Sequence, residues 1–465
     1  MHPTSGALRR EASVRTQSAL GSRHSAVTLA CTGRANSAGM LRSPLLFLLP
    51  PHATMRLFRL LVVAALLCPS VLSSQHAARA PTFNTNRLAR IDSWVQRLIA
   101  EGKIPGAVIM ITHDGRTVYH KAFGYRDLGT HVAQQPNDIF RIASQTKAIT
   151  SLAVMMLWEE GRFRLDDPIG NYLPALKEQA VLTKFNPADS SFEAKSARKR
   201  MTIRQLLTHT SGLDYADIGS DDFKAIYARA GISAIGHEGD VLADKVDRLG
   251  KLPLKHEPGE RFTYGLSVDV LGRFVEVMSG VPLDQFFRTR IFEPLGMRDT
   301  YFAVPADKRD RLVALHIIKD GKLVASHEMT SGVHPDFPAR PVTYFSGGGG
   351  LSSTTTDYAR FLQLFLNGGE LAGTRLLGRK TVELMLTNQM GSLQPAFGLG
   401  FELETAENDY RSPLTIGSFS WGGAFNTAYW ADPKERLIGL IFTNTSGASV
   451  ALGDPFKVLV YSALQ

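Results

Sequence analysis

The sequence has 465 residues, of which 44% are apolar and 20% are charged, as in an ordinary soluble globular protein. The formal net charge is +9, but residues 1–80 hold nine Arg and a single acidic residue, Glu11, and so carry +8 of it. The rest of the chain is close to neutral, which argues against a nucleic-acid-binding surface.

The first 80 residues have the features of a leader. Residues 1–54 are rich in Ser, Arg and Ala without periodicity, and we expect them to be disordered or to precede the true start at Met55. From Met55, two arginines precede an apolar run over 60–67, and the segment ends in the A-x-A pattern at 78–80. We therefore predict a signal peptide over 55–80 and export to the periplasm or the medium. The run is too short to span a membrane, and the alternative is a buried N-terminal helix.

Both cysteines, Cys31 and Cys68, fall within this leader. A mature chain of residues 81–465 would contain no cysteine. It could then form no disulfide, thiol nucleophile or cysteine metal site.

Two hairpins are predicted near opposite ends of the mature chain. The run "GAVIMITHDGRTVYHKAFGY" has β-rich halves on either side of Asp114-Gly115, and "TAYWADPKERLIGLIFTNT" turns around Asp432-Pro433-Lys434. Strands at both ends with helices between them suggest one antiparallel sheet closed by distant segments and carrying a helical lobe. The predicted fold class is therefore α/β of the α+β type, with 81–465 as one domain.

The predicted helices each have a polar start and a glycine stop. They cover 87–101 and the segments "RMTIRQLLTHTSG", "GLSVDVLGRFVEVMSG" and "STTTDYARFLQLFLNGG". The polar run 184–200 and the region 305–345 are predicted as exposed loops, and 347–350 as a flexible glycine turn.

One further helix carries candidate chemistry. In "FRIASQTKAITSLAVMMLWEEG" the segment from Ser144 to Glu160 lacks Gly and Pro, is apolar on most sides and ends before Gly161. Ser144 and Lys147, at i and i+3, share one face. Burial would lower the pKa of Lys147 and make a neutral amine available to accept the Ser144 proton. The backbone N–H of Ser144, in the first turn, would face a developing oxyanion.

The presence or absence of other motifs excludes several classes of active site. A second Ser-x-x-Lys copy, Ser196 to Lys199, lies in a highly charged segment and is expected to be a solvated loop. GxSxG, HExxH and P-loop patterns are absent, and the thirteen histidines lack ligand spacing. We expect His209 in "LLTHTSG" to be structural. No metal and no organic cofactor is implied.

Two more segments accompany the Ser-x-x-Lys helix. "PGERFTYGLSVDVLG" places Tyr264 before an apolar helix, and "SFSWGGAFNTAYW" places Trp421-Gly422-Gly423 at the start of a C-terminal strand. Taken singly, each is more typical of core packing than of catalysis. Their combination and order are what point to a shared site.

In these motifs the chain resembles the serine β-lactamase and penicillin-binding-protein superfamily, and most of all class C β-lactamases and family VIII carboxylesterases. The resemblance spans about 85–460 and includes "IFEPLGMRDTYF" and "GGGLSSTTTDYARF". It implies a cleft between the sheet and the helical lobe, with Ser144 as nucleophile, Lys147 as its base partner and Tyr264 as proton relay. It also implies an oxyanion hole formed by the backbone N–H groups of Ser144 and Ala424.

Two departures from the superfamily pattern favour a neutral substrate. Tyr264-Gly265-Leu266 lacks the amide of the Y-x-N motif, and Trp421-Gly422-Gly423 lacks the cation and hydroxyl of K-T-G. The leading hypothesis is a serine hydrolase that cleaves small or short-chain esters, with Trp421, Gly422 and Gly423 in contact with the substrate. The alternatives are a β-lactamase or D-alanyl-D-alanine peptidase that acts on an amide, and a non-catalytic binder of cell-wall fragments.

Overall fold

The computed structural model describes residues 82–235, 239–329 and 333–465. The chain divides into two compact units, Met1–Ala78 and Arg79–Gln465, and every described residue belongs to the second. The predicted leader, its signal peptide and both cysteines thus lie outside the described residues. Within the described part, no helix is both long and apolar enough to cross a bilayer.

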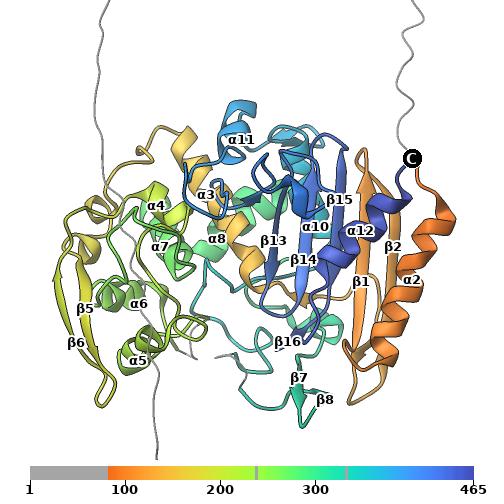
Figure 1. The fold of residues 1–465 in the computed structure, drawn as a ribbon, viewed down its shortest axis with the longest axis horizontal. Helices are drawn as coiled ribbons and strands as arrows, with labels where there is room; N and C mark the ends of the chain where they lie inside the picture. The colour runs from red at the N-terminus through yellow and green to blue at the C-terminus, as the bar shows by residue number, and fades with distance from the viewer. Residues whose placement is uncertain (1–81, 236–238, 330–332) are drawn as a thin grey trace, which may run out of the picture. The chain divides into compact units, whose positions relative to one another are not determined.

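A seven-stranded antiparallel sheet organises the second unit (Figure 1). Its order is β12-β13-β14-β15-β1-β2-β3. The first long strand pairs directly with the last, so that Val108 lies opposite Phe442. This confirms the predicted sheet closed by distant segments. The strands are β1 (Gly106–His113), β2 (Arg116–Asp127), β3 (Val132–Ala133), β12 (Glu402–Leu403), β13 (Phe419–Gly423), β14 (Thr427–Asp432) and β15 (Leu437–Phe442).

Local turn chemistry sets both predicted hairpins. Asp114 and Gly115 have φ values of 51° and 71°, the left-handed pair that a two-residue hairpin turn requires. At the second hairpin, the Asp432 carboxylate accepts hydrogen bonds from the backbone N–H groups of Lys434 and Glu435, both at 3.0 Å. Both hairpins are confirmed.

The sheet is buried on both faces. In β1, Val108 and Met110 join one hydrophobic core and Ile109 and Ile111 join another, because successive side chains point to opposite faces. Two helices cover each face: α2 (Thr85–Ala100) and α12 (Gly453–Ala463) on one, α3 (Thr146–Glu159) and α10 (Thr355–Leu366) on the other.

A helical lobe lies beside the sheet, at the left of Figure 1. Thr202 and Gln205 form a capping box at the polar start of α4, and Gly280 ends α7 with a φ of 76°, as predicted for a glycine stop. The glycine stop predicted for α4 is wrong, because this helix ends at Leu207. The helices outside the sheet layers are α4 (Ile203–Leu207), α5 (Asp221–Arg229), α6 (Leu242–Leu249), α7 (Ser267–Ser279), α8 (Leu283–Phe287), α9 (Glu293–Leu295) and α11 (Arg379–Met385).

Two predicted loops are wrong in part. The run 184–200 contributes to an exposed hairpin of β5 (Ala180–Asn186) and β6 (Ser191–Ser196), and the region 305–345 holds β7 (His316–Lys319) and β8 (Lys322–Ala325). β6 and β8 have no buried residue, and a strand of that kind need not show the apolar alternation by which periodicity reveals strands. The remaining strands are β4 (Phe140–Arg141), β9 (Ser352–Ser353), β10 (Glu370–Leu371), β11 (Thr374–Arg375) and β16 (Thr445–Ser446).

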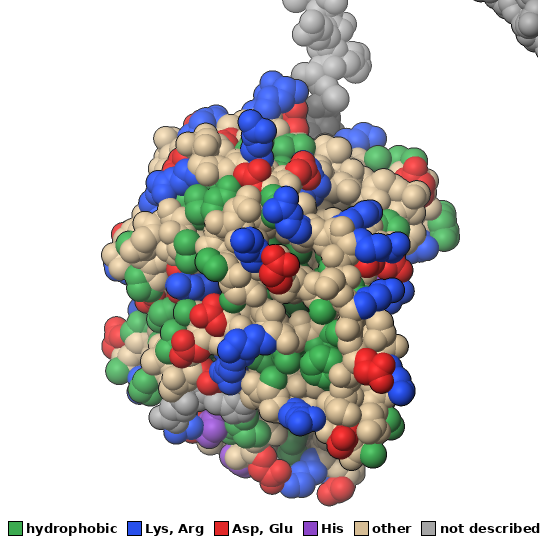
Figure 2. Space-filling view, turned by 90° about the vertical axis from the view of Figure 1, so that its left-hand side faces the viewer, with side chains coloured by type: hydrophobic (Ala, Val, Ile, Leu, Met, Phe, Trp, Pro, Cys, Tyr) green, Lys and Arg blue, Asp and Glu red, His purple; other side chains and the backbone are tan. Residues whose placement is uncertain are grey.

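Figure 2 shows one face of the molecule, on which basic and acidic side chains are interspersed. No patch of a single charge sign dominates this face. The view agrees with the near-neutral charge of the chain after residue 80. The fold as a whole is the predicted α+β arrangement of an antiparallel sheet, flanking helices and a helical lobe.

Candidate active site

Ser144 lies in a 3₁₀ turn directly before α3. The α-helix begins at Thr146 rather than at Ser144 as predicted, because its first turn tightens into the 3₁₀ form. The preceding residue, Ala143, has a φ of 44°, a strained value for a residue with a side chain. From α10, the Tyr358 hydroxyl donates to the carbonyl of Gln145 at 2.8 Å. The fold therefore holds the serine on a constrained turn.

Lys147 is buried, as predicted, with 3% of its surface exposed. Its Nζ lies 3.3 Å from Ser144 Oγ, 3.1 Å from the Tyr215 hydroxyl and 2.7 Å from the carbonyl oxygen of Gly348. The amine is thus held within reach of the serine hydroxyl by two other partners.

The direction of the Lys147 pKa shift differs from the prediction. Burial on its own lowers the pKa of Lys147, but the hydroxyls of Tyr215 and Tyr264 and the carboxylate of Asp269 outweigh burial and raise it. The sequence argument counted only burial, because these three partners come from later parts of the chain. An ammonium is therefore the resting form of Lys147, and a proton must leave the site before it can act as a base.

Tyr264 lies in the loop before α7 and faces the same amine. Lys147 Nζ is 4.6 Å from the centroid of the Tyr264 ring, a cation–π distance. The Tyr264 ring also contacts Tyr215, His209 and Trp421, at centroid distances of 5.3, 4.9 and 5.5 Å. The structure thus brings the predicted tyrosine to the serine and lysine, while its role as a proton relay stays a prediction.

Tyr215 was missed by the sequence analysis. It is buried, and burial raises the pKa of its hydroxyl. Its only signal is its position two residues after "THTSGL", in a loop without periodicity. The hydrogen bond to Lys147 makes Tyr215 a second candidate for the acid–base group.

His209 packs its ring against the Tyr264 ring at the site. Its ring is fully buried beside Tyr264 and Phe262, and burial together with the nearby Lys147 charge holds its pKa well below the usual range. A neutral ring packed among aromatic side chains supports the structural role that the sequence suggested.

The Trp421-Gly422-Gly423 motif forms the end of β13, not its start as predicted. A Cβ at Gly423 would lie 2.5 Å from the carbonyl oxygen of Ile142, so only glycine lets the strand come this close to the serine turn. The Trp421 ring stands 5.3 Å from the ring of Phe397 as well as beside Tyr264. An aromatic side chain of β13 therefore lines the cleft beside Tyr264.

Ser144 opens into a cleft of about 420 Å³ that the predicted substrate-contact residues share. Ala424, the predicted second oxyanion donor, lines the same cleft, although its N–H role stays a prediction. Sequence reasoning missed Lys457 and Glu402, which also line it; Lys457 Nζ is 3.0 Å from Asp454 Oδ1. The lining residues are Ser144, Ile218, Tyr264, Glu402, Ser420, Trp421, Gly422, Gly423, Ala424, Ala428, Tyr429, Trp430, Gly453 and Lys457.

The second Ser-x-x-Lys copy has a different environment. Ser196 ends the strand β6 and is exposed, as is Lys199. The motif was expected in a loop, whereas Ser196 lies at the end of a strand. The solvent exposure of the motif is as predicted. Both side chains face solvent, and the pair serves as an internal comparison for the Ser144 site.

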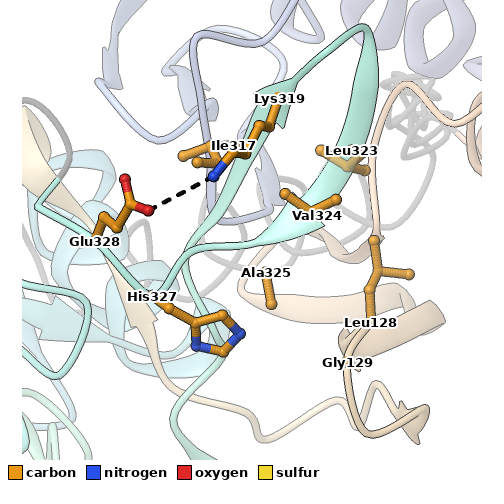
Figure 3. Close-up of a pocket in the computed structure, with 9 residues that line it drawn as sticks. All are labelled: Leu128, Gly129, Ile317, Lys319, Leu323, Val324, Ala325, His327 and Glu328. Carbon is orange, nitrogen blue, oxygen red and sulfur yellow. Dashed lines mark ion pairs between the residues drawn. The ribbon is translucent and has the colours of Figure 1, made fainter.

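A separate cavity of about 370 Å³ lies against the β7–β8 hairpin (Figure 3). It is lined in part by Leu128, Val324 and the ion pair of Lys319 with Glu328, whose closest atoms are 3.5 Å apart. Both charged side chains are mostly exposed, and no Ser, Thr or Cys is among the described residues that line the cavity. Among the described residues, no cluster of three metal-binding side chains occurs either.

Comparisons with known proteins agree with this geometry. The beta-lactamase family profile matches residues 91–461. The lovastatin esterase of Penicillium rubens is 32% identical over 381 residues, covering 75% of this chain and 91% of the esterase. Esterase EstB of Burkholderia gladioli is 29% identical over 420 residues, covering 86% of this chain and 100% of EstB.

A solved structure shares the fold. EstCE1, described as a hydrolase with promiscuous acyltransferase activity, superimposes with a TM-score of 0.69 at 26% identity, covering 80% of this chain and 98% of EstCE1. The family profile spans most of the chain and coincides with the sheet, the helical lobe and the serine turn. The protein therefore belongs to the beta-lactamase family and is a serine hydrolase.

Proposed function

We propose that the protein hydrolyses neutral esters of small or short-chain acids through an acyl-enzyme on Ser144. The observation that carries this proposal is the aromatic wall of Trp421 and Tyr264 beside the serine. A tryptophan offers apolar area and one N–H donor but no positive charge for an anionic substrate. The resemblance to named esterases supports the same reaction class.

In the proposed reaction, Ser144 Oγ bonds to the ester carbonyl carbon while its proton passes to the pair of Lys147 and Tyr264. The backbone N–H groups of Ser144 and Ala424 stabilise the tetrahedral oxyanion. The alcohol then leaves with the transferred proton. Water attacks the acyl-enzyme by the same route, releasing the acid and restoring the serine. Because Lys147 rests as an ammonium, the lysine–tyrosine pair must first lose one proton.

A second candidate is hydrolysis of an anionic β-lactam or D-alanyl-D-alanine peptide. Lys457 in the cleft lining favours it, since a cation there could attract a substrate carboxylate. Its ammonium is already paired with Asp454, which reduces the charge it can offer. We therefore rank this function below ester hydrolysis.

Trp421→Lys tests the choice between the two substrates. Attraction between unit charges 4 Å apart is worth about 4 kcal/mol at an effective dielectric of 20. We expect the ratio of kcat/KM for a chromogenic cephalosporin to that for a nitrophenyl ester to rise roughly tenfold or more. The ratio is the measured quantity, because the substitution also removes apolar contact with the ester.

Lys457→Met is the matched variant, because it removes the cation that already lines the cleft. If wild type hydrolyses the cephalosporin as fast as the ester, the esterase proposal is wrong. A specific loss of cephalosporin turnover in Lys457→Met would then identify the cation responsible.

We further propose that the protein is exported after cleavage near residue 80. N-terminal sequencing of secreted protein is expected to begin near Pro81, following the A-x-A pattern. Secreted material that retained the apolar run 60–67 would contradict this proposal.

A further inference from the structure

The segment from Ser346 to Gly348 leads into the glycine turn and lies between α3 and α7. Its glycine carbonyls face α3. The Gly348 carbonyl accepts the shortest of the three hydrogen bonds from Lys147, at 2.7 Å. The Gly347 carbonyl accepts a hydrogen bond from Thr150 Oγ1, also at 2.7 Å. The position of the catalytic amine thus depends on where this turn is held.

Asp269 of α7 holds the opposite side of the turn. Its Oδ1 accepts the backbone N–H of Gly348 at 3.2 Å and the hydroxyl of Ser346 at 2.6 Å. The side chain is fully buried, and Oδ2 has no hydrogen-bond partner among the described residues. A buried carboxylate with an unpaired oxygen costs stability, and its two hydrogen bonds do not by themselves explain a charged residue here.

One residue, Gly348, therefore lies between the carboxylate of Asp269 and the ammonium of Lys147. The N–H of Gly348 donates toward Asp269, and the carbonyl of Gly348 accepts from Lys147. The Asp269 carboxylate therefore fixes the residue whose carbonyl faces Nζ, and its negative charge acts on the ammonium through space. A Cβ at Gly348 would overlap Asp269 Oδ2, so the contact also requires a glycine.

We propose that Asp269 is a positioning residue for Lys147: it holds Gly348 so that the Gly348 carbonyl orients Nζ toward Ser144, and its carboxylate supplies the countercharge of the ammonium. This inference rests on the proposed acyl-enzyme function and deepens it, because it assigns the control of the base to a residue that does not touch the substrate cleft. The raised pKa of Lys147 is consistent with a buried negative charge nearby.

Other titratable groups surround both ends of this connection. Tyr215, Tyr264 and His209 face Lys147 from the lobe. On the Asp269 side, burial lowers the pKa of Lys245 of α6, which pairs with Asp240 at 2.9 Å. Ser346 and the buried phenol of Tyr344 also lie near Asp269.

Asp269→Asn removes the charge and keeps an acceptor for Gly348. We expect kcat for a nitrophenyl ester to fall about 10- to 100-fold while KM changes less than about threefold. Without the negative charge the pKa of Lys147 falls, so the ascending limb of the pH profile of kcat/KM moves about one unit or more to lower pH. Wild-type kinetics would overturn the proposal. A reduced kcat with an unmoved limb would also overturn it, since that pattern indicates a structural role only.

Gly348→Ala provides a second test if the asparagine variant does not fold. The new methyl group would displace the turn from Asp269, so we expect the same loss of kcat. Gly349→Ala is the matched control, because a Cβ there meets nothing closer than 3.8 Å. Equal kinetics in the two alanine variants would overturn the proposal.

The rate at which a fluorophosphonate labels Ser144 is measured across pH for the same variants. This readout needs no ester turnover. If the reagent labels Ser144 in the wild-type protein but the protein cleaves no ester, the proposed ester hydrolysis is wrong. The labelling rates of the variants then still test the positioning role of Asp269. Labelling of Asp269→Asn that equals wild type at every pH would then overturn the inference alone.

Discussion

Ser144→Ala is expected to lower kcat/KM for a nitrophenyl ester by on the order of 10⁴-fold or more, because no other nucleophile in the cleft can form the acyl-enzyme. Ser420 also lines the cleft, but the structure gives it no contact with a buried amine. The measurement is steady-state kinetics with melting temperatures, which should agree within a few degrees between variant and wild type.

Ser196→Ala is the control for this experiment. It changes the same residue type in the same Ser-x-x-Lys pattern at an exposed strand end. We expect unchanged turnover. Retained activity in Ser144→Ala, or its loss in Ser196→Ala, would contradict the assignment of the nucleophile.

Lys147→Met is expected to reduce kcat/KM by about 10²- to 10⁴-fold, the range for loss of a general acid–base group. In wild type, the pKa of Lys147 is raised, and so is that of Tyr215. Activity requires the deprotonated pair, so kcat/KM should climb with pH and reach its plateau on the alkaline side of neutrality. The measurement is a pH profile of kcat/KM for wild type and variant.

Lys199→Met is the matched control, since Lys199 occupies the same place in the exposed copy of the motif. We expect a profile identical to that of wild type. A wild-type profile that is already flat from mildly acidic pH would mean that the Lys147 pKa is lowered rather than raised. The original expectation from burial would then be right.

Local signals in the sequence predicted the framework that holds the site. The Asp114-Gly115 turn requires left-handed backbone at two residues, and this requirement is visible in the sequence as a residue pair. The pairing of β1 with β15 followed from two β-rich runs at opposite ends of the chain. The buried helix that carries Lys147 followed from its apolar faces.

The electrostatics of the site could not be predicted in the same way. Tyr215 reaches Lys147 from 68 residues away, through a loop whose path depends on the packing of the whole lobe. Asp269 accepts hydrogen bonds from Ser346 and Gly348, in yet another segment of the chain. Lys457 enters the cleft only because α12 packs against the sheet. Each contact is set by tertiary structure, and neither periodicity nor a short motif encodes it.

Trapping the acyl-enzyme tests the central claim most directly. Wild-type protein is mixed with a nitrophenyl ester, quenched in acid during turnover and examined by intact-mass and peptide mass spectrometry. We predict a mass increase equal to the acyl group, located on the peptide that contains Ser144 and absent from Ser144→Ala. Finding the acyl group on a different serine of the wild-type protein during turnover would contradict the account. An acyl adduct that persists in Ser144→Ala would contradict it too.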